Sequence, residues 1–132
     1  MTPSRLRPVF LAAVASCVFA AAGPASASPQ ATARDEIDHL LQYVAASSCT
    51  FVRNGTEYPA AEARDHLATK YRFVGSRIAT AEDFIKYLAT GSSMSGEPYH
   101  VRCGQTDEFS GKWLTAELNR YRKQPHLQRV AH

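Results

Sequence analysis

This chain of 132 residues carries a formal net charge of +3 at pH 7, and 45% of its residues are hydrophobic. The length allows one small domain, and the modest charge excludes the strongly basic surface that nucleic acids attract. We therefore expect no nucleic-acid partner. The sequence shows no internal repeat and no linker between domains.

The first 27 residues have the pattern of a secretory signal peptide. Arg5 and Arg7 precede an apolar run over 9–22, and Ala25-Ser26-Ala27 has the small-x-small form of a cleavage site. Cleavage near Ala27 would leave 105 residues with a net charge of +1, because both arginines leave with the leader. The sequence thus predicts a periplasmic or secreted protein with no transmembrane segment in the mature chain.

Cys17 allows a second interpretation of the leader. The residues Val14-Ala15-Ser16-Cys17 are similar to a bacterial lipobox, in which the cysteine is lipidated and becomes the first residue. However, the apolar run continues past Cys17, where a lipoprotein would leave the membrane through a polar tether. We favour cleavage near Ala27, with a lipid anchor at Cys17 or an uncleaved anchor as the alternatives.

Two cysteines, Cys49 and Cys103, remain after cleavage, and we expect them to form a disulfide. An even pair in a small exported domain is typical of a structural bond, whereas a catalytic redox pair has C-x-x-C spacing. Two buried free thiols would suit a cytosolic protein better.

We expect a flexible tether over 28–34, an α+β domain over 35–124 and a tail over 125–132. Apolar residues at helical spacing predict four helices, over 35–46, 59–74, 81–90 and 111–124.

Short β-favouring runs on either side of Asn54-Gly55 predict a hairpin with a type I′ turn, over 49–58. A third strand is predicted over 98–103, and 104–109 is interpreted as a polar loop. The order α-β-β-α-α-β-α predicts a three-stranded antiparallel sheet with four helices. The disulfide would join the start of the first strand to the end of the third.

Several segments together resemble a small exported bacterial family, domain of unknown function 5329. They are 49–58, 75–78, 80–85, 95–103, 111–114 and 121–122. The resemblance covers about 37–123. It implies a bacterial, exported protein of about a hundred residues, with no assigned activity and no catalytic residues to transfer.

The sequence indicates neither a metal site nor a cofactor, because its histidines are scattered and lack ligand spacing. The enzymatic alternative is a small envelope hydrolase that uses a serine of the 92–95 loop, with His100 or Lys70 as the base. Neither G-x-S-x-G nor S-x-x-K is present, so we expect no enzyme.

Binding is the function that the sequence favours. Arginine beside small-residue loops suits a carboxylate or a phosphate. Our hypothesis is a recognition surface for an envelope protein or a peptidoglycan fragment, formed by Arg77, Ser93, Ser95 and Tyr99. A structural or stress-protective protein without a discrete ligand is the remaining alternative.

Overall fold

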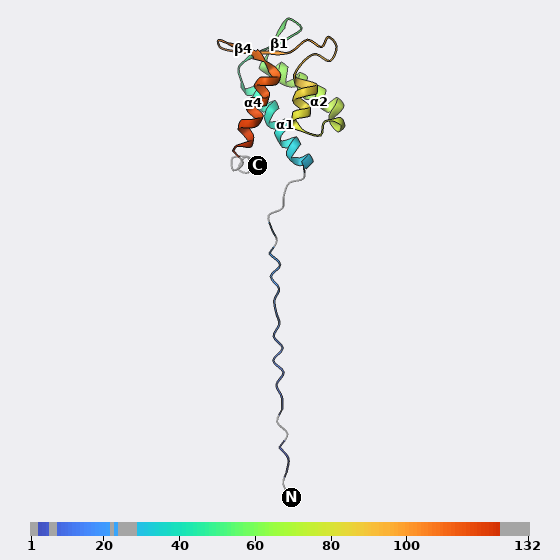
Figure 1. Ribbon diagram of the computed structural model, residues 1–132, viewed down its shortest axis with the longest axis vertical. Coiled ribbons are helices and arrows are strands. Elements are labelled where there is room, and N and C mark those ends of the chain that lie inside the picture. The colour runs from blue at the N-terminus through green and yellow to red at the C-terminus, as the bar shows by residue number, and fades with distance from the viewer. Residues whose placement is uncertain (1–2, 6–7, 22, 24–28, 125–132) are drawn as a thin grey trace.

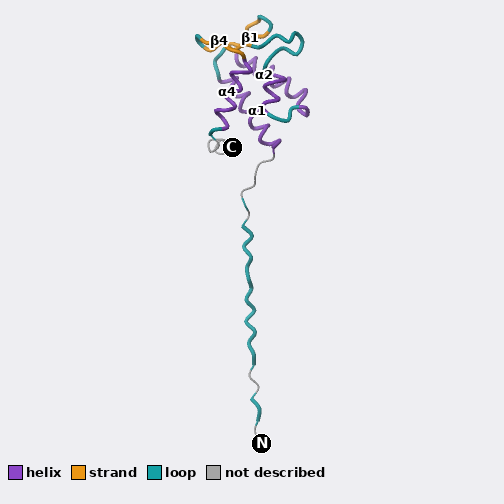
Figure 2. Tube along the Cα trace, viewed as in Figure 1, coloured by secondary structure: helices purple, strands orange, loops and turns teal. Residues whose placement is uncertain are grey.

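The computed structural model describes residues 3–5, 8–21, 23 and 29–124. Its strands are β1 (Thr50–Arg53), β2 (Thr56–Pro59), β3 (His100–Cys103) and β4 (Thr106–Phe109). Its helices are α1 (Pro29–Ala46), α2 (Ala60–Val74), α3 (Ala81–Phe84) and α4 (Ser110–Arg122), with a 3₁₀ turn η1 (Gly75–Arg77) and a π-helical turn η2 (Ile85–Ala89). The strands gather at one end of the domain, and the helices extend away from them (Figures 1 and 2).

The sheet has four antiparallel strands in the order β2-β1-β3-β4. The predicted α+β class with four helices and one disulfide is confirmed, but the predicted three-stranded sheet is wrong. The segment interpreted as a polar loop contains β4, which pairs with β3 from His100↔Phe109 to Cys103↔Thr106. Asp107 and Glu108 disfavour a strand in isolation, yet they are tolerated on an edge strand that pairs on one side only.

Helix α1 begins at Pro29, inside the segment that was predicted to be a tether. Ala33 is buried, and it extends toward the N-terminus the buried stripe formed by Ile37, Leu40 and Val44. The helical spacing of these residues explains the longer helix. The proposed cleavage site and the tail over 125–132 lie outside the described residues.

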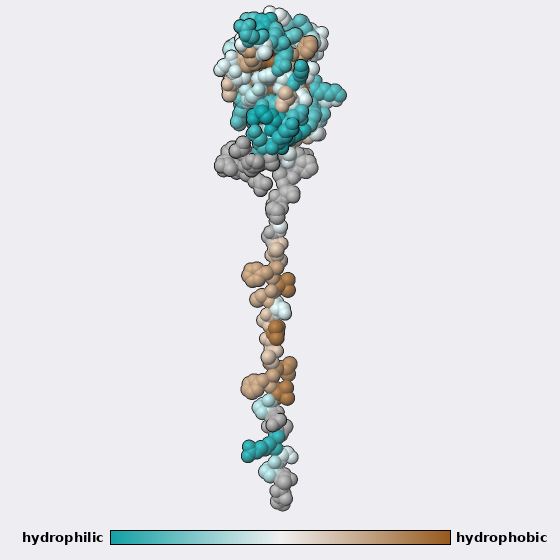
Figure 3. Space-filling view, turned by 60° about the vertical axis from the view of Figure 1, so that its left-hand side comes forward, coloured by the Kyte–Doolittle hydropathy of each residue, from teal (hydrophilic) through white to brown (hydrophobic). Residues whose placement is uncertain are grey.

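Residues 8–21 form no helix or strand, and their large apolar side chains are exposed (Figure 3). Cys17, in this run, is a free cysteine. Within the parts of the chain that the structure describes, none of the helices combines the length and apolarity needed to cross a membrane.

The domain contains two similar halves, each a hairpin followed by a helix. A hairpin and a helix occur at 50–74 and recur at 100–122, offset by 50 positions. The inner strands pair so that Phe51 faces Val101, with Thr50↔Arg102 and Val52↔His100 on either side. This register is symmetric about the Phe51–Val101 pair, so an approximate two-fold axis relates the halves. Over the ten hairpin positions only Thr56 and Thr106 are identical.

The two hairpins turn in different ways. Asn54 and Gly55 both have positive φ, 49° and 74°, which confirms the predicted type I′ turn. In the second hairpin Gly104 alone has positive φ, 59°, at the first central position, as in a type II′ turn.

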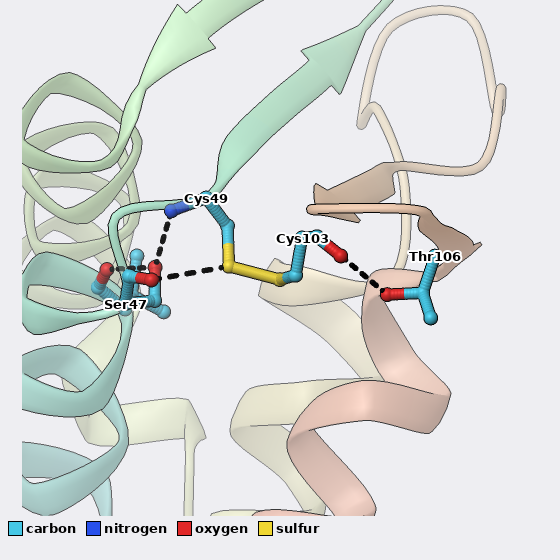
Figure 4. The surroundings of a disulfide bond; sticks show 5 residues. Ser47, Cys49, Cys103 and Thr106 are labelled. Atoms are coloured by element: carbon cyan, nitrogen blue, oxygen red, sulfur yellow. Dashed lines mark hydrogen bonds between the residues drawn. A yellow bond between two sulfur atoms is a disulfide. The ribbon is translucent and has the colours of Figure 1, made fainter.

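The disulfide joins Cys49 to Cys103 across the inner strands, as predicted (Figure 4). Continuing the β1–β3 register by one position brings these residues opposite each other, and their Cα atoms lie 4.6 Å apart. The Ser47 hydroxyl accepts a hydrogen bond from the Cys49 amide, and Thr106 donates one to the Cys103 carbonyl. The bond therefore fixes the register of the two halves.

The core lies between the helices and the inner face of the sheet. Its largest fully buried side chains are those of Phe84, Ile37, Leu40, Leu114, Leu118, Val44 and Val101. The outer face of the sheet is polar, because Arg102 pairs there with Glu57 and Asp107, and His100 also pairs with Asp107. This face therefore needs no further layer.

Ion pairs join helices that are distant in the sequence. Arg122 of α4 binds both oxygens of Glu36 in α1, at 2.8 and 2.9 Å, and also binds Glu82 of α3. Burial acts to raise the pKa of Glu117, but hydrogen bonds from Arg120 and His39 outweigh it, and the pKa lies below its ordinary value. These carboxylates are partnered within the fold.

Candidate functional site

A small cavity lies between the β1–β2 hairpin and helix α2. Its volume is about 140 Å³, similar to a cavity that accepts a single aromatic ring. Strand alternation turns the side chains of Phe51, Arg53 and Tyr58 toward the helix. Tyr99, the residue before β3, also lines the cavity. The lining consists of Phe51, Val52, Arg53, Tyr58, Glu62, Ala63, His66, Leu67, Tyr99 and Ser110.

The two-fold relation between the halves explains how the site arises. The β1–β3 register, continued by one position at its other end, brings Arg53 opposite Tyr99. The symmetric position holds the Cys49–Cys103 disulfide. One end of the inner strand pair is therefore closed by a covalent bond, while the other carries a cation and a phenol.

The cavity exists because a small residue stands where the second half has a large one. Ala63 is the fourth residue of α2, and Trp113 is the fourth residue of α4. Trp113 packs on Tyr43, with ring centroids 4.5 Å apart, and against the edge of Phe51 at 5.6 Å. Ala63 leaves the corresponding space beside α2 unfilled.

Arg53 carries the main polar group of the cavity. Its Nη1 atom lies 3.0 Å from Nδ1 and 2.9 Å from Nε2 of His66, and its guanidinium lies 5.6 Å from the Tyr58 ring centroid. A guanidinium is positively charged and can only donate, so its close contact with the His66 ring favours the neutral imidazole. Burial, Arg53 and Lys70 all lower the pKa of His66, in agreement with this geometry.

Lys70 supplies a second cation at the edge of the site. Its Nζ atom donates to the Leu88 carbonyl at 2.7 Å and to the Tyr99 hydroxyl at 3.3 Å. Burial, and then the charge of Arg53, lower the pKa of Lys70. Burial also raises the pKa of Tyr99, whose hydroxyl therefore keeps its proton at neutral pH.

The backbone holds Tyr99 on both sides. Its amide donates to the Thr90 carbonyl, and its carbonyl accepts from the Ser110 amide, each at 2.9 Å. Thr90 in turn follows the π-helical turn, and its hydroxyl donates to the Ile85 carbonyl at 2.6 Å. The backbone of Tyr99 is thus held between the end of η2 and the start of α4.

No carboxylate of the described residues forms an ion pair with Arg53 or Lys70. Arg64, Arg102, Arg120 and Arg122 each have such a partner. Glu62 is the one acid in the cavity lining, and it is exposed. A partly buried guanidinium with no internal counter-charge favours an anion at this place.

The structure does not bring the four predicted binding residues together. Tyr99 lines the cavity, but Arg77, Ser93 and Ser95 are not part of its lining. Ser95 donates to the side-chain oxygen of Asn54 at 2.7 Å. Arg77 and Ser93 are exposed, and neither side chain forms a hydrogen bond or an ion pair with any residue in the described ranges.

The residues considered for a hydrolase also have other contacts. The Ser92 hydroxyl accepts from the amides of Met94 and Ser95, as in a turn. His100 pairs with Asp107 on the outer face of the sheet, and Lys70 bonds to Leu88 and Tyr99. In the described part of the chain, no hydrogen bond joins a serine of this loop to either candidate base.

Sequence reasoning missed Arg53, Tyr58 and His66 as site residues. One signal was present: an arginine two positions after Phe51 in a strand lies on the same face as that buried aromatic. The sequence does not identify His66, because its distance from Arg53 depends on how the hairpin folds back on α2.

A second hollow lies between η2 and α4, with a volume of about 860 Å³ and a wide opening. Several of its polar groups are already bonded within the fold: Glu82 to Arg122, Thr90 to Ile85 and Thr115 to Gly111. It is also more open than the cavity beside α2, so it would enclose less of a small ligand.

Comparison with known proteins identifies the family of this chain. The profile of a family of unknown function, DUF5329, matches residues 31–122. The uncharacterized protein YfeK of Salmonella typhimurium is 40% identical over 77 residues, which cover 58% of this chain and 64% of that protein. The match thus spans somewhat less than two thirds of the length of that relative. No solved structure matches this chain. Because the profile covers most of the chain, the protein belongs to the DUF5329 family of unknown function.

Proposed function

We propose that this protein is a small, non-enzymatic binding module, and that its ligand enters the cavity between the β1–β2 hairpin and α2. The observation that carries the proposal is the contrast between Ala63 and Trp113 at equivalent helix positions. One half of the fold is filled at this place, whereas the other keeps a cavity with apolar walls and a few convergent polar groups. Such a combination is typical of a ligand site.

The size of the cavity limits what it holds. A volume of about 140 Å³ suits one ring or a short branched chain. The cavity would thus take a small molecule or an anchoring group of a larger partner. In the envelope, such a partner would be a protein or a peptidoglycan fragment.

We also propose that the protein works outside the cytoplasm. The leader pattern over 1–27 supports export, and the Cys49–Cys103 bond suits an oxidising compartment. The preferred route is cleavage near Ala27, with release into the periplasm or the medium. A lipid anchor at Cys17 is the alternative.

Filling the cavity is expected to abolish binding. Ala63→Trp places in α2 the residue that α4 has at the equivalent position, so the side chain should occupy the cavity. Titration of the 15N-labelled protein with phenylacetate and phenylacetamide, followed by NMR, measures the effect. We expect shifts around Phe51 and Tyr99 in the wild type, and affinity at least about tenfold lower in Ala63→Trp.

Ala61→Trp is the matched control, because Ala61 is an exposed alanine on the same helix. It should bind as the wild type does. Thermal unfolding of both variants shows whether the added ring is accommodated, and Ala63→Leu is a smaller substitute if it is not. Unchanged binding in a folded Ala63→Trp, or no binding of any fragment to the wild type, would refute the proposed site.

A further inference from the structure

We infer that the ligand group taken by the cavity beside α2 is a monoanionic carboxylate attached to a single ring or a short branched chain, with Arg53 as its counter-ion. This inference rests on the proposed function, and it adds the chemical class of the ligand. It follows from four features of the site: free charge, the arrangement of donors, the apolar walls and the balance of formal charge.

The first feature is the unused charge of Arg53. Its contacts in the described structure are the His66 ring and the Tyr58 face, and neither carries a negative charge. The guanidinium has five N–H donors, of which the neutral imidazole can accept one. The remaining donors match the paired oxygens of a carboxylate.

The second feature is the set of neutral donors around Arg53. Tyr99 lies opposite Arg53 across the inner strands, and Tyr58 lies below its guanidinium. Both phenols line the cavity. A carboxylate on Arg53 would thus lie in a cavity that two phenols also line, and no carboxylate of the described residues forms an ion pair with Arg53 to compete.

The apolar walls determine the rest of the ligand. Phe51 and Leu67 are buried at 7% and 5% exposure, and Ala63 leaves the space between strand and helix open. An aromatic ring or a branched chain would replace water there, and its burial would add to the charged contact.

The balance of formal charge favours one negative charge over two. Arg53 and Lys70 supply two positive charges around the site, and Glu62 supplies one negative charge. The excess of one positive charge matches a carboxylate and is too small for a phosphate dianion. His66 is neutral in the contact with Arg53 and adds none.

The test compares three small probes on the purified full chain with its disulfide intact. They are phenylacetate, its neutral analogue phenylacetamide, and phenylphosphonate. Isothermal titration and NMR should give phenylacetate a Kd of about 1 mM, as expected for ten non-hydrogen atoms. Phenylacetamide should bind about tenfold more weakly, because it cannot form the charged pair.

Arg53→Gln is expected to remove the preference for the anion, bringing the two affinities to within about twofold of each other. Arg102→Gln is the matched control: Arg102 is on the neighbouring strand but faces outward, paired with Glu57 and Asp107. It should keep the full preference. If Arg53→Gln does not fold, Arg53→Lys retains the charge without the fork and should reduce the preference only in part.

Equal binding of phenylacetate and phenylacetamide to the wild type would overturn the carboxylate and leave the cavity as an apolar site. Tighter binding of phenylphosphonate than of phenylacetate would overturn the single charge. An equal loss of preference in Arg102→Gln and Arg53→Gln would overturn the role of Arg53. Absence of binding by all three probes would instead refute the proposed function itself.

Discussion

Replacing Cys49 and Cys103 together by alanine is expected to lower the free energy of unfolding by about 4 kcal/mol. The bond closes a loop with a sequence separation of 54, and the chain-entropy relation gives this magnitude for such a loop. Marginal small domains have little more stability than this in total. The variant should therefore be largely unfolded at 37 °C.

Denaturant unfolding of the oxidised wild type, the reduced wild type and the double variant measures the effect. The reduced wild type is the internal control and should lose about as much stability as the variant, since both lack the cross-link. A loss below about 1 kcal/mol in both would show that the two halves are held together without the bond.

The mass of the chain recovered from the native envelope tests the same bond and the proposed export. We expect a chain that begins at Ser28 and gains about 2 Da on reduction, because one disulfide takes up two hydrogen atoms. A chain that begins at a lipidated Cys17 would contradict release and would make the protein a membrane-tethered lipoprotein.

Truncating Phe84 is expected to have an effect of similar size. Phe84→Ala should destabilise the fold by about 3–5 kcal/mol, the range for a large aromatic side chain deleted from a packed core. Phe84 is fully buried, and its ring meets the edge of Tyr71 at 5.8 Å and 85°. It lies in α3, which packs on α1, and the contact with Tyr71 connects it to α2.

Phe73→Ala provides a matched control, because Phe73 is 89% exposed. The same change there should alter stability by less than about 0.5 kcal/mol. Chemical denaturation of both variants gives the comparison. Equal effects at positions 73 and 84 would mean that α3 does not form part of the cooperative core.

Much of the fold could be predicted from the sequence because its signals are local. The type I′ hairpin follows from Asn54-Gly55, since both residues adopt positive φ. The Thr80 hydroxyl accepts a hydrogen bond from the Asp83 amide and caps the helix, as the three-residue spacing of this pair indicates. The pairing of Cys49 with Cys103 follows from their number and from the predicted export. Each of these features depends on a few residues and hardly at all on the rest of the fold.

Strand β4 could not be predicted in this way. Its residues Thr106, Asp107 and Glu108 are polar, and only pairing with β3 makes them a strand. The ion pairs that Arg102 and His100 form with Asp107 arise after that pairing. Tertiary context therefore overrides the local preference for a loop.

The candidate site could not be predicted, because the sequence similarity of the two hairpins and their structural correspondence differ in register by one residue. The letters Val-Arg-x-Gly occur in both hairpins, at Val52–Gly55 and Val101–Gly104. In the structure, however, the halves correspond with an offset of 50 rather than 49. A shift of one residue exchanges the faces of a strand, so Arg53 points inward and Arg102 outward. The sequence alone does not distinguish the two arginines.

The most direct measurement of the central claim is a crystal structure of the protein soaked with phenylacetate. We expect the ring to lie between Phe51 and Leu67, with the carboxylate within hydrogen-bond distance of the Arg53 guanidinium, about 2.7–2.9 Å. Density for the ligand in the open hollow between η2 and α4, with the cavity beside α2 empty, would contradict the account.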